Sequence, residues 1–522
     1  MSGGVNLPRL RQVWTVLGWS SGLLLLGLSF RVANFNLAAL IGGLADSLAL
    51  VRELVPPDFS HWRQILRLAG ETVTIGFWGT FLGMLFSLPL GFLAARNTAG
   101  HPLLHLLAKG LVNVWRAIPD LIYALIFVIA FGLGPLAGMA ALTLATVGLL
   151  GKFYAEAIES IDQKPVEALE AAGSHGLSVI RFAVFPQVFP LFMGYNLYLF
   201  DHNIRVAMVL GLVGAGGLGV ELFTQMRAFS YQKAAAVLLC ILLVITAIDR
   251  LSAYLRRGLI DGVFLAGPRR LADLLLLTVL ILLALVSLVL TPINVADLAA
   301  GLPRLAEFLR AMWPPDFGPW RTYGSLLLET VGMGITGTFL AALLALPLGI
   351  LSARNLVSGH WFLDLVYNLA KEITNFLRAM PELMFALIFV VAVGLGPFAG
   401  VLALAFHTAG FLGKFYAEAI ENIDPGPVEA IEATGSRFGQ KLRHGVWPQI
   451  TALFHSYNLY ILDRNIRAST LMGVVGAGGI GFELVMSMKL FEYQRTAALV
   501  LLILATILAC DWLSTYLRSR VL

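Results

Sequence analysis

The sequence predicts an all-α transmembrane protein of about 12 helices, arranged as two parallel six-helix repeats. Composition is the first reason, because 58% of the 522 residues are hydrophobic and only 13% are charged, whereas a soluble domain carries about 25% charged residues. Duplication is the second reason: residues 151–173 return at 413–435 with 18 of 23 positions identical and no gap. These observations exclude a soluble globular enzyme and indicate a two-fold membrane protein.

Apolar runs long enough to cross a hydrocarbon core of about 30 Å recur in both halves. In the first half they lie near 13–30, 72–95, 115–133, 136–153, 184–212 and 234–255. In the second half they lie near 272–291, 330–351, 377–395, 398–415, 446–474 and 496–517. Early matches between the halves are offset by 258 residues and later ones by 262. We therefore expect a first repeat of about six transmembrane helices at 1–261, a cytoplasmic linker at 262–270 and a second such repeat at 271–522.

Basic residues gather at the ends of these runs, where they set membrane orientation. Those that fit a cytoplasmic side are Arg9, Arg11, Arg96, Arg256, Arg257, Arg269, Arg270, Arg518 and Arg520. Both termini and both copies of the duplicated loop are therefore expected in the cytoplasm. The segments 31–67 and 292–325 would be external, and although each carries arginines, both contain Pro-Pro-Asp-Phe and indicate ordered elements. The net charge of +5 arises mostly at span ends and gives no sign of a nucleic-acid partner.

The duplicated segment has the pattern of a surface loop that holds a short helix. Each copy breaks at 162–165 or 424–427, where Asp and Pro start a new helix, with Glu167 or Glu429 in its favourable first turn. Gly173 and Gly435 are natural helix ends. Lipid-facing sequence drifts freely among apolar residues, so a polar segment kept in both halves is expected to contact a specific partner.

The loop resembles the EAA loop of ABC importer permeases, whose short helix docks on the ATP-binding subunit. The spacing fits from Glu167-Ala168-Leu169 through Gly173 to Pro186, and from Glu429-Ala430-Ile431 through Gly435 to Pro448. The resemblance implies ATPase-coupling roles for Glu167, Ala168, Glu170, Gly173, Glu429, Ala430, Glu432 and Gly435. The chain departs from the usual pattern at Leu169 and Ile431, which replace an alanine, and at Ala183 and Gly445, which replace an isoleucine.

Further motifs are similar to those of the phosphonate importer permease. They are Pro56 to Asp58, Arg116 to Asp120, Tyr195 to Arg205 with the glycines of 211–219, and Tyr457 to Arg467 with the glycines of 473–481. The resemblance covers nearly the whole chain, as two family units fused. It implies type I ABC importer permease architecture and import of phosphonate, phosphite, hypophosphite or phosphate across the bacterial inner membrane. Implied partners are two copies of a cytoplasmic ABC ATPase, which bind ATP and Mg, a periplasmic phosphonate-binding protein and membrane lipid.

Polar residues inside the spans are candidates for a substrate pathway, because a charge at the bilayer centre costs about 2.5–3.5 kcal/mol. Asp201 and Arg205, like Asp463 and Arg467, are four residues apart and share a helix face. Each pair either neutralises itself or presents its arginine to phosphonate oxygens. The residues expected to add neutral donors are Asn196, Asn203, Asn458 and Asn465. Arg116 and Arg378 either extend to the membrane interface or line an exit.

Two glycine strings match a dinucleotide-binding fingerprint only formally, because they follow no strand and have no acidic partner about twenty residues on. Their members are Gly214, Gly216, Gly217, Gly476, Gly478 and Gly479. Close helix packing, or an unwound turn that offers backbone N–H groups to an anion, is the expected role. No cofactor is expected in this chain, and the absence of a Gly-x4-Gly-Lys-Ser/Thr sequence places ATP hydrolysis on a partner subunit.

Other functions remain as alternatives. A stand-alone ion-coupled secondary transporter with 6+6 repeats would need ion-coordinating residues deep in the spans and no partner loops. A membrane-embedded enzyme would need a catalytic constellation in one half, and the sequence offers none. His175 and His407 are not repeated, and Cys240 and Cys510 lie at non-equivalent positions, so no metal site is expected.

Overall fold

The computed structural model describes residues 22–36, 42, 49–50, 52–260, 287, 295–357 and 359–521. Within these ranges the regular structure is entirely helical, which confirms the predicted fold class. Seven of the described helices are long and apolar enough to cross a membrane, and three bent helix pairs raise the number of candidate spans to ten. Residues 13–21 of the predicted span 13–30, and all of the predicted span 272–291 except residue 287, lie outside the described residues.

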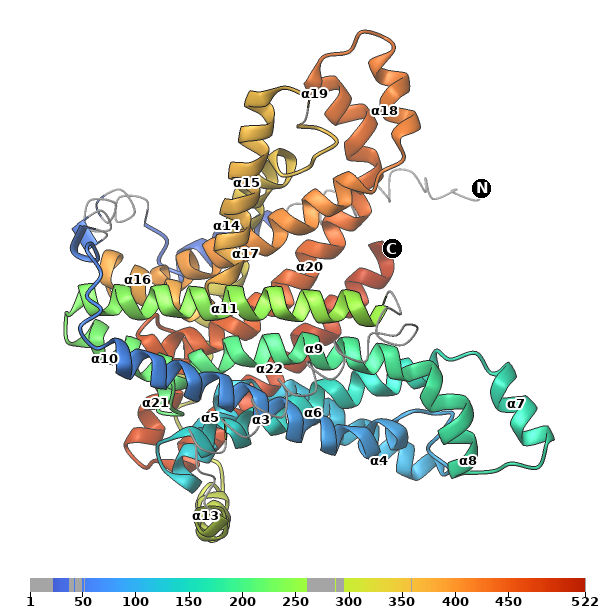
Figure 1. Cartoon of the computed structure of the whole chain (residues 1–522). Coiled ribbons are helices and arrows are strands. Elements are labelled where there is room, and N and C mark those ends of the chain that lie inside the picture. The colour runs from blue at the N-terminus through green and yellow to red at the C-terminus, as the bar shows by residue number, and fades with distance from the viewer. Residues whose placement is uncertain are drawn as a thin grey trace, which may run out of the picture. The chain divides into compact units, whose positions relative to one another are not determined.

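Residue contacts divide the chain into two compact units (Figure 1). We call Val51–Pro314 the inner unit, and Met1–Leu50 together with Pro315–Leu522 the split unit. These units are defined by contacts in space, whereas the predicted repeats 1–261 and 271–522 were defined by duplicated sequence and stay a prediction. The N-terminal helix Gly22–Val32 therefore belongs to the same unit as the second half of the sequence.

The helices follow the same order from α3 to α11 in the inner unit and from α14 to α22 in the split unit, and the inner unit also includes α13. In the inner unit they are α3 (Trp62–Ala94), α4 (Pro102–Ala117), α5 (Asp120–Phe131), α6 (Pro135–Glu159), α7 (Lys164–Ala171), α8 (Leu177–Val179), the π-helical turn η1 (Ile180–Val184), α9 (Phe185–Leu210), η2 (Gly211–Val213), α10 (Leu218–Arg227), α11 (Tyr231–Ile260) and α13 (Val295–Ala311). In the split unit they are α14 (Trp320–Leu351), α15 (Trp361–Ala379), α16 (Glu382–Val393), α17 (Pro397–Glu421), α18 (Pro425–Glu432), α19 (Phe438–Lys441), the π-helical turn η3 (Leu442–Val446), α20 (Trp447–Met472), η4 (Gly473–Val475), α21 (Ile480–Lys489) and α22 (Tyr493–Val521).

Glycines bring the central helices of each unit close together. A Cβ atom on Gly79 of α3 would lie 2.5 Å from Leu142 Cβ on α6, and one on Gly91 would lie 2.6 Å from Tyr154 Cβ. The corresponding position in the split unit, Gly349, approaches Tyr416 of α17 at the same 2.6 Å. Small residues at helix crossings allow this spacing in membrane proteins. The α3–α6 and α14–α17 pairs are therefore the packed centres of the two units.

The predicted spans 115–133 and 377–395 are not continuous helices. The chain turns by 88° between α4 and α5, and by 93° between α15 and α16. Ile118 and Met380 are extended, with ψ of 123°, because each precedes a proline that disfavours the helical conformation before it. These runs are apolar, as predicted, but each is divided between two helices and does not form one straight span.

Helix Gly22–Val32 packs on the split unit far along the chain. The hydroxyl of Thr336 on α14 donates to Ser29 Oγ at 3.1 Å, and the ring of Phe30 contacts that of Phe339, with centroids 5.9 Å apart. Ala33, just past the helix end, is fully buried with Met333 and Val401. The N-terminal helix thus packs against the unit that contains the C-terminus through Ser29 and Phe30, while Leu23, Leu24 and Leu25 on the same helix are exposed.

Candidate functional site

The short helices α7 and α18 lie at one end of their own units, beyond the long helices they follow (Figure 1). Their predicted coupling residues are all exposed: Glu167, Ala168, Glu170, Glu429, Ala430 and Glu432. Gly173 and Gly435 end the two loops in the left-handed region, with φ of +84° and +75°, as a helix-ending glycine does. The predicted short helix and its glycine end are therefore confirmed in both loops, and Glu167 lies in the first turn of α7. Glu429 does not lie in the first turn of α18, because that helix already starts at Pro425. The partner contact of the loops stays a prediction.

Helix α18 packs on the start of the helix that follows it, at the positions where the loop differs from the usual EAA pattern. Val428 is buried in a cluster with Val446 and Ile450, so the loop helix rests on the start of α20. A Cβ atom on Gly445 would lie 3.3 Å from Val428 and 3.5 Å from Ile431 Cδ1. The small residue in the π-helical turn thus makes room for the larger residue in the loop helix.

A glutamine that the sequence analysis did not single out ties each loop to the long helix that follows. Gln187 Oε1 accepts the N–H of Asp162 at 3.1 Å, and its Nε2 donates to the carbonyls of Asp162 at 3.2 Å and Ala183 at 2.8 Å. Gln449 makes the same bonds to Asp424 and Gly445, at 3.0, 3.2 and 2.8 Å. The available signal was that the two glutamines are 262 residues apart, as the loops are.

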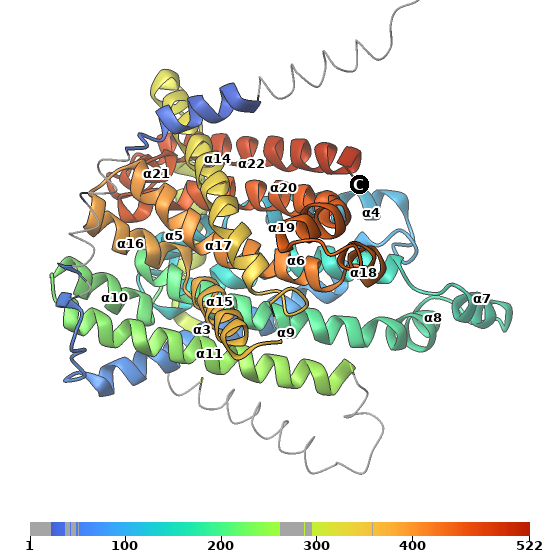
Figure 2. The ribbon, with the colours of Figure 1, turned by 90° about the horizontal axis from the view of Figure 1, so that it is seen from above.

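The predicted ion pairs form on α9 and α20. Arg205 pairs with Asp201 one turn earlier and also donates to Asp249 Oδ1 on α11 at 3.0 Å. Figure 2 shows α9 and α11 running side by side, which is why residues 44 positions apart can meet. In the split unit, Arg467 contacts Asp463 at 3.1 Å. Asp249 is the member that the sequence analysis missed, although Asp511 repeats it at the expected offset.

The four candidate asparagines hydrogen-bond inside their own units. Asn203 donates to the hydroxyls of Thr80 and Thr146 at 2.8 Å each, so it joins α9 to α3 and α6. Asn465 donates to Thr338 at 3.0 Å and accepts from Thr408 at 2.8 Å. Both asparagines are almost fully buried.

The other two asparagines accept from tyrosines of the central helices. Asn196 Oδ1 accepts the Tyr154 hydroxyl at 2.6 Å, and Asn458 Oδ1 accepts the Tyr416 hydroxyl at 3.0 Å. These four asparagines thus hold α9 and α20 in register with their neighbours. Their contribution to a substrate pathway stays a prediction.

The glycine strings form an unwound turn in both units. Gly214, Gly216 and Gly217 have φ between +77° and +92°, and Gly476, Gly478 and Gly479 have φ between +75° and +89°. Gly217 N–H donates to Glu71 Oε1 at 2.8 Å, and the next N–H, of Leu218, donates to Thr72 Oγ1 at 2.9 Å. The unwound turn, one of the two expected roles, is therefore present, and its N–H groups bond to side chains of the same unit. A contact of these N–H groups with a substrate anion stays a prediction.

Arg116 and Arg378 lie in the last turns of α4 and α15, just before the two sharp bends. The backbone there touches the central helices: a Cβ atom on Gly148 would lie 2.7 Å from Arg116 N, and one on Gly410 would lie 2.7 Å from Arg378 N. The two arginines therefore occupy corners of the fold. Whether they line an exit stays a prediction.

One charged cluster belongs to the split unit and has different residues in the inner unit. Glu382 Oε2 lies 3.0 Å from His407 Nε2 and 3.3 Å from an Arg464 guanidinium nitrogen, and the guanidinium lies over the ring of Phe411. The equivalent residues of the inner unit are Asp120, Ala145 and His202. Among the described residues, no group of three or more His, Cys, Asp or Glu side chains could hold a metal ion.

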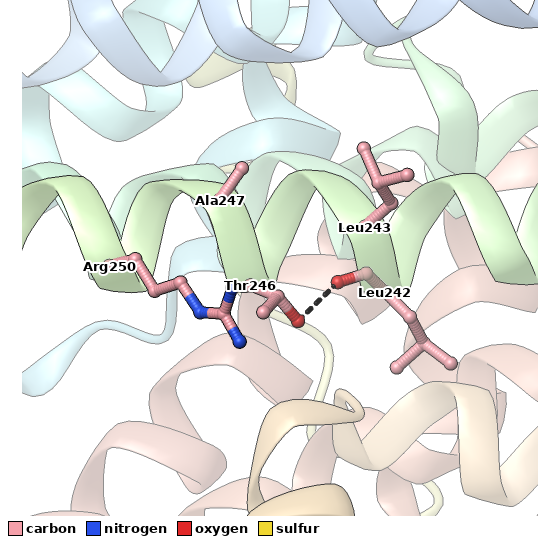
Figure 3. A pocket seen from close by; sticks show the side chains of 5 residues that line it. All are labelled: Leu242, Leu243, Thr246, Ala247 and Arg250. Carbon is pink, nitrogen blue, oxygen red and sulfur yellow. Dashed lines mark hydrogen bonds between the residues drawn. The ribbon is translucent and has the colours of Figure 1, made fainter.

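A shallow depression on α11 contains none of the predicted site residues (Figure 3). It is formed by one face of a single helix, from Leu242 to Arg250, and the Thr246 hydroxyl within it donates to the Leu242 carbonyl of the same helix at 2.7 Å. The polar groups that converge do so between helices, along α9 and α20. The candidate site is therefore a set of helix contacts and two surface loops.

Residues 87–261 and 345–522 each match the family described as binding-protein-dependent transport system inner membrane component. The chain belongs to this family and carries two of its units, so it is a multi-pass membrane component of a transport system. The matches begin within α3 and α14 and include both duplicated loops.

Relatives of the chain have names that refer to phosphorus compounds. The phosphate-import permease protein PhnE of Mycolicibacterium smegmatis is 38% identical over 93% of this chain and 91% of its own. The phosphite transport system permease protein PtxC of Stutzerimonas stutzeri is 44% identical over 43% of this chain and 82% of its own. The cryptic phosphonate transport permease PhnE2 of Escherichia coli K12, named as putative, is 46% identical over 23% of this chain and 98% of its own.

A solved structure of the MetNI methionine ABC transporter in an inward-facing conformation contains a chain with similarity to this one. It is 21% identical, with a TM-score of 0.35, over 39% of this chain and 99% of that chain.

Proposed function

We propose that this chain is the permease of an ABC importer that moves phosphonate or a related phosphorus oxyanion into the cytoplasm, and that two family units are fused in it. The observation that carries the proposal is the pair of exposed helices α7 and α18, each ended by a left-handed glycine. The near full-length similarity to a phosphate-import permease supports the substrate class. Phosphate, phosphite and phosphonate share tetrahedral phosphorus with anionic oxygens, so one pathway chemistry serves all of them.

The proposed division of labour follows from what the exposed helices offer. Helices α7 and α18 present short surfaces on which glutamates lie among small residues and prolines. Such surfaces fit grooves on a cytoplasmic ATPase, and two such helices call for two ATPase copies. ATP and Mg would be held by those partners in the cytoplasm, where both termini of this chain are also placed. A periplasmic binding protein would deliver the oxyanion and select it, since a translocation path must release its substrate as readily as it accepts it.

Arg205 and Arg467 are the cationic residues best placed to meet an oxyanion on α9 and α20. Each is held by an aspartate one turn earlier, so its planar guanidinium is oriented before a substrate arrives. The aspartate also lowers the net positive charge, which favours release over trapping. In this proposal the motion of α7 and α18 reaches these arginines through the helices that carry them.

The decisive experiment is purification of the tagged chain from its own host in a mild detergent, with quantification of the proteins that accompany it. A P-loop ATPase at about two copies per chain, and ATP-dependent uptake of radiolabelled phosphonate or phosphite by proteoliposomes of that complex, are expected. A chain that purifies alone and binds no ATPase at high lipid content would contradict the coupling role of α7 and α18.

A secondary transporter is the second candidate, and the cluster of Asp201, Arg205 and Asp249 inside the spans favours it. Ion-coupled carriers use buried carboxylates of this kind. Uptake by proteoliposomes that contain the chain alone, driven by a proton or sodium gradient without ATP, would support this candidate. Uptake that needs both the ATPase and ATP would exclude it.

A further inference from the structure

Gln187 on α9 and Gln449 on α20 hydrogen-bond these long helices to the loops that contain α7 and α18. Each side-chain amide pairs with both backbone groups of one residue at the start of the loop, Asp162 or Asp424, and donates a third bond to the carbonyl four residues before itself. Lengths in the two units agree within 0.1 Å for every bond. Two copies of the same three-bond arrangement indicate a function that both units need.

The apolar seat of the loop helix cannot do the same task alone. Val428 of α18 packs against the start of α20, and Val166 of α7 packs in the equivalent cluster of the inner unit. Such contacts hold the loop helix against the long helix, but because they are non-directional they do not fix its sliding or rotation. Hydrogen bonds to the loop backbone are directional and resist displacement both towards and away from the long helix.

The glutamines also lie on the helices that carry the polar site. Gln187 is the third residue of α9, on which Asn196, Asp201 and Arg205 follow, and Gln449 is the third residue of α20. The third hydrogen bond of each glutamine ends in a π-helical turn, η1 or η3. A displacement of the loop that is transmitted through Gln187 therefore enters α9 at its first turn.

We propose that Gln187 and Gln449 are positioning residues that transmit movement of the ATPase-docking helices to α9 and α20 in both directions. This inference rests on the proposed coupling function of α7 and α18. Without the two amides, the docking helices still bind the ATPase, but they move without carrying α9 and α20 with them. ATP hydrolysis then continues while substrate movement per ATP falls.

The test uses the full complex of chain, ATPase and binding protein in proteoliposomes, with phosphite as the transported probe. Gln187→Met together with Gln449→Met keeps side-chain length and removes the amide. We expect ATPase retention and hydrolysis within about twofold of the unmodified complex, and transported phosphite per hydrolysed ATP lowered on the order of tenfold. A ratio equal to that of the unmodified complex would overturn the proposal.

Two controls separate this outcome from simpler ones. Gln232→Met changes an exposed glutamine on α11, outside the docking helices and outside α9 and α20, and is expected to leave the ratio unchanged. Gln187→Glu with Gln449→Glu keeps the acceptor oxygen and loses the donors, so an intermediate ratio is expected. If the double Met variant does not assemble, each single Met variant is expected to show a partial loss of the ratio, and an unchanged ratio in both contradicts the proposal.

Two further outcomes distinguish a failure of this inference from a failure of the proposed function. If the double Met variant loses the ATPase itself, the glutamines only seat the docking helix and do not transmit movement, which overturns the inference. If the unmodified chain never binds an ATPase, the proposed function fails before the glutamines are tested.

Discussion

The carboxylate of Glu71 accepts the backbone N–H of Gly217 at 2.8 Å and so joins α3 to the start of α10. Glu329 and Gly479 repeat the contact at 2.7 Å in the split unit. N–H groups at a helix start have no partner within the helix and carry partial positive charge, so a carboxylate is a strong acceptor for them. Each glycine turn is therefore an anion-binding turn that already holds an anion of the protein.

Removal of this acceptor is expected to loosen the turn. Glu71→Ala with Glu329→Ala should lower the free energy of unfolding by about 1–3 kcal/mol per site, the usual penalty for a buried donor left without a partner. Glu71→Gln with Glu329→Gln keeps an acceptor oxygen and should cost less. Thermal unfolding in detergent, followed by tryptophan fluorescence, measures both. Equal losses for Ala and Gln would show that the hydrogen bond is not what stabilises the turn.

The amide of Asn203 is expected to be required for folding. Asn203→Leu removes the donor shared by Thr80 and Thr146, so the yield of monodisperse protein should fall, with a loss of about 1–3 kcal/mol in stability. Asn113→Leu, at an exposed position on α4, is the matched control and should change neither. Size-exclusion profiles and thermal midpoints are the measurements. Full yield of Asn203→Leu with lost transport would instead place Asn203 on the substrate pathway.

Arg205 neutralises carboxylates on two helices, which makes its removal testable by compensation. Arg205→Ala leaves Asp201 and Asp249 as like charges inside the spans, and removing one partner of a buried pair typically costs about 3–5 kcal/mol. Addition of Asp201→Asn and Asp249→Asn should restore the yield of folded protein. Phosphite uptake by this triple variant then reports on the pathway. Uptake near that of the unmodified chain would assign the cluster a structural role only.

The side chains of Glu382, His407 and Arg464 in the split unit are expected to be energetically coupled. His407→Ala and Arg464→His introduce the residues found at the equivalent positions of the inner unit, and Glu382→Asp completes the exchange. Each single change should destabilise, but the triple change should cost less than the sum by about 1 kcal/mol or more, because contacting residues are not additive. Unfolding free energies of the set give this coupling energy. Strict additivity would show that the three side chains do not interact in the membrane.

The loop glycines are expected to tolerate asparagine better than aspartate. Gly173→Asp with Gly435→Asp should abolish transport while the chain still inserts, because a negative charge at the end of α7 and α18 opposes the helix dipole and enters the ATPase contact. Asn adopts the left-handed conformation at small cost and adds no charge, and a Cβ atom meets nothing within 4 Å at either position. Uptake assays on membranes with matched chain content compare the two. Unimpaired uptake by the Asp variant would refute the assignment of the loops.

Local signals made much of this fold predictable. Gly173 requires a left-handed conformation that glycine adopts readily, and Pro165 favours the first turn of a helix, so the loop helix could be placed from the sequence. The 262-residue offset then transferred each assignment to the second half. The sharp bend at Ile118 was missed because an apolar run indicates burial in lipid without indicating direction.

Partnerships between distant residues were beyond the reach of a single sequence. Glu71 and Gly217 are 146 residues apart, and Asn203 reaches Thr80 across 123. Nothing in the local pattern selects these pairs from the other polar residues of the spans. Gln187 was missed for a different reason. Its amide bonds to the backbone of Asp162, and every residue has such backbone groups, so the sequence contains no complementary side chain that would identify the partner.

Ser29 and Thr336 are hydrogen-bonded but lie 307 residues apart in the sequence, so a long interval separates their synthesis on the ribosome. At about 5–20 residues per second, the ribosome needs roughly 15–60 s between the two residues, and the inner unit is made entirely within that interval. During it, helix Gly22–Val32 lacks the α14 surface on which it packs in the finished protein. Assembly of the split unit is therefore the last step, and a chain released before α14 is made leaves its first helix without a partner.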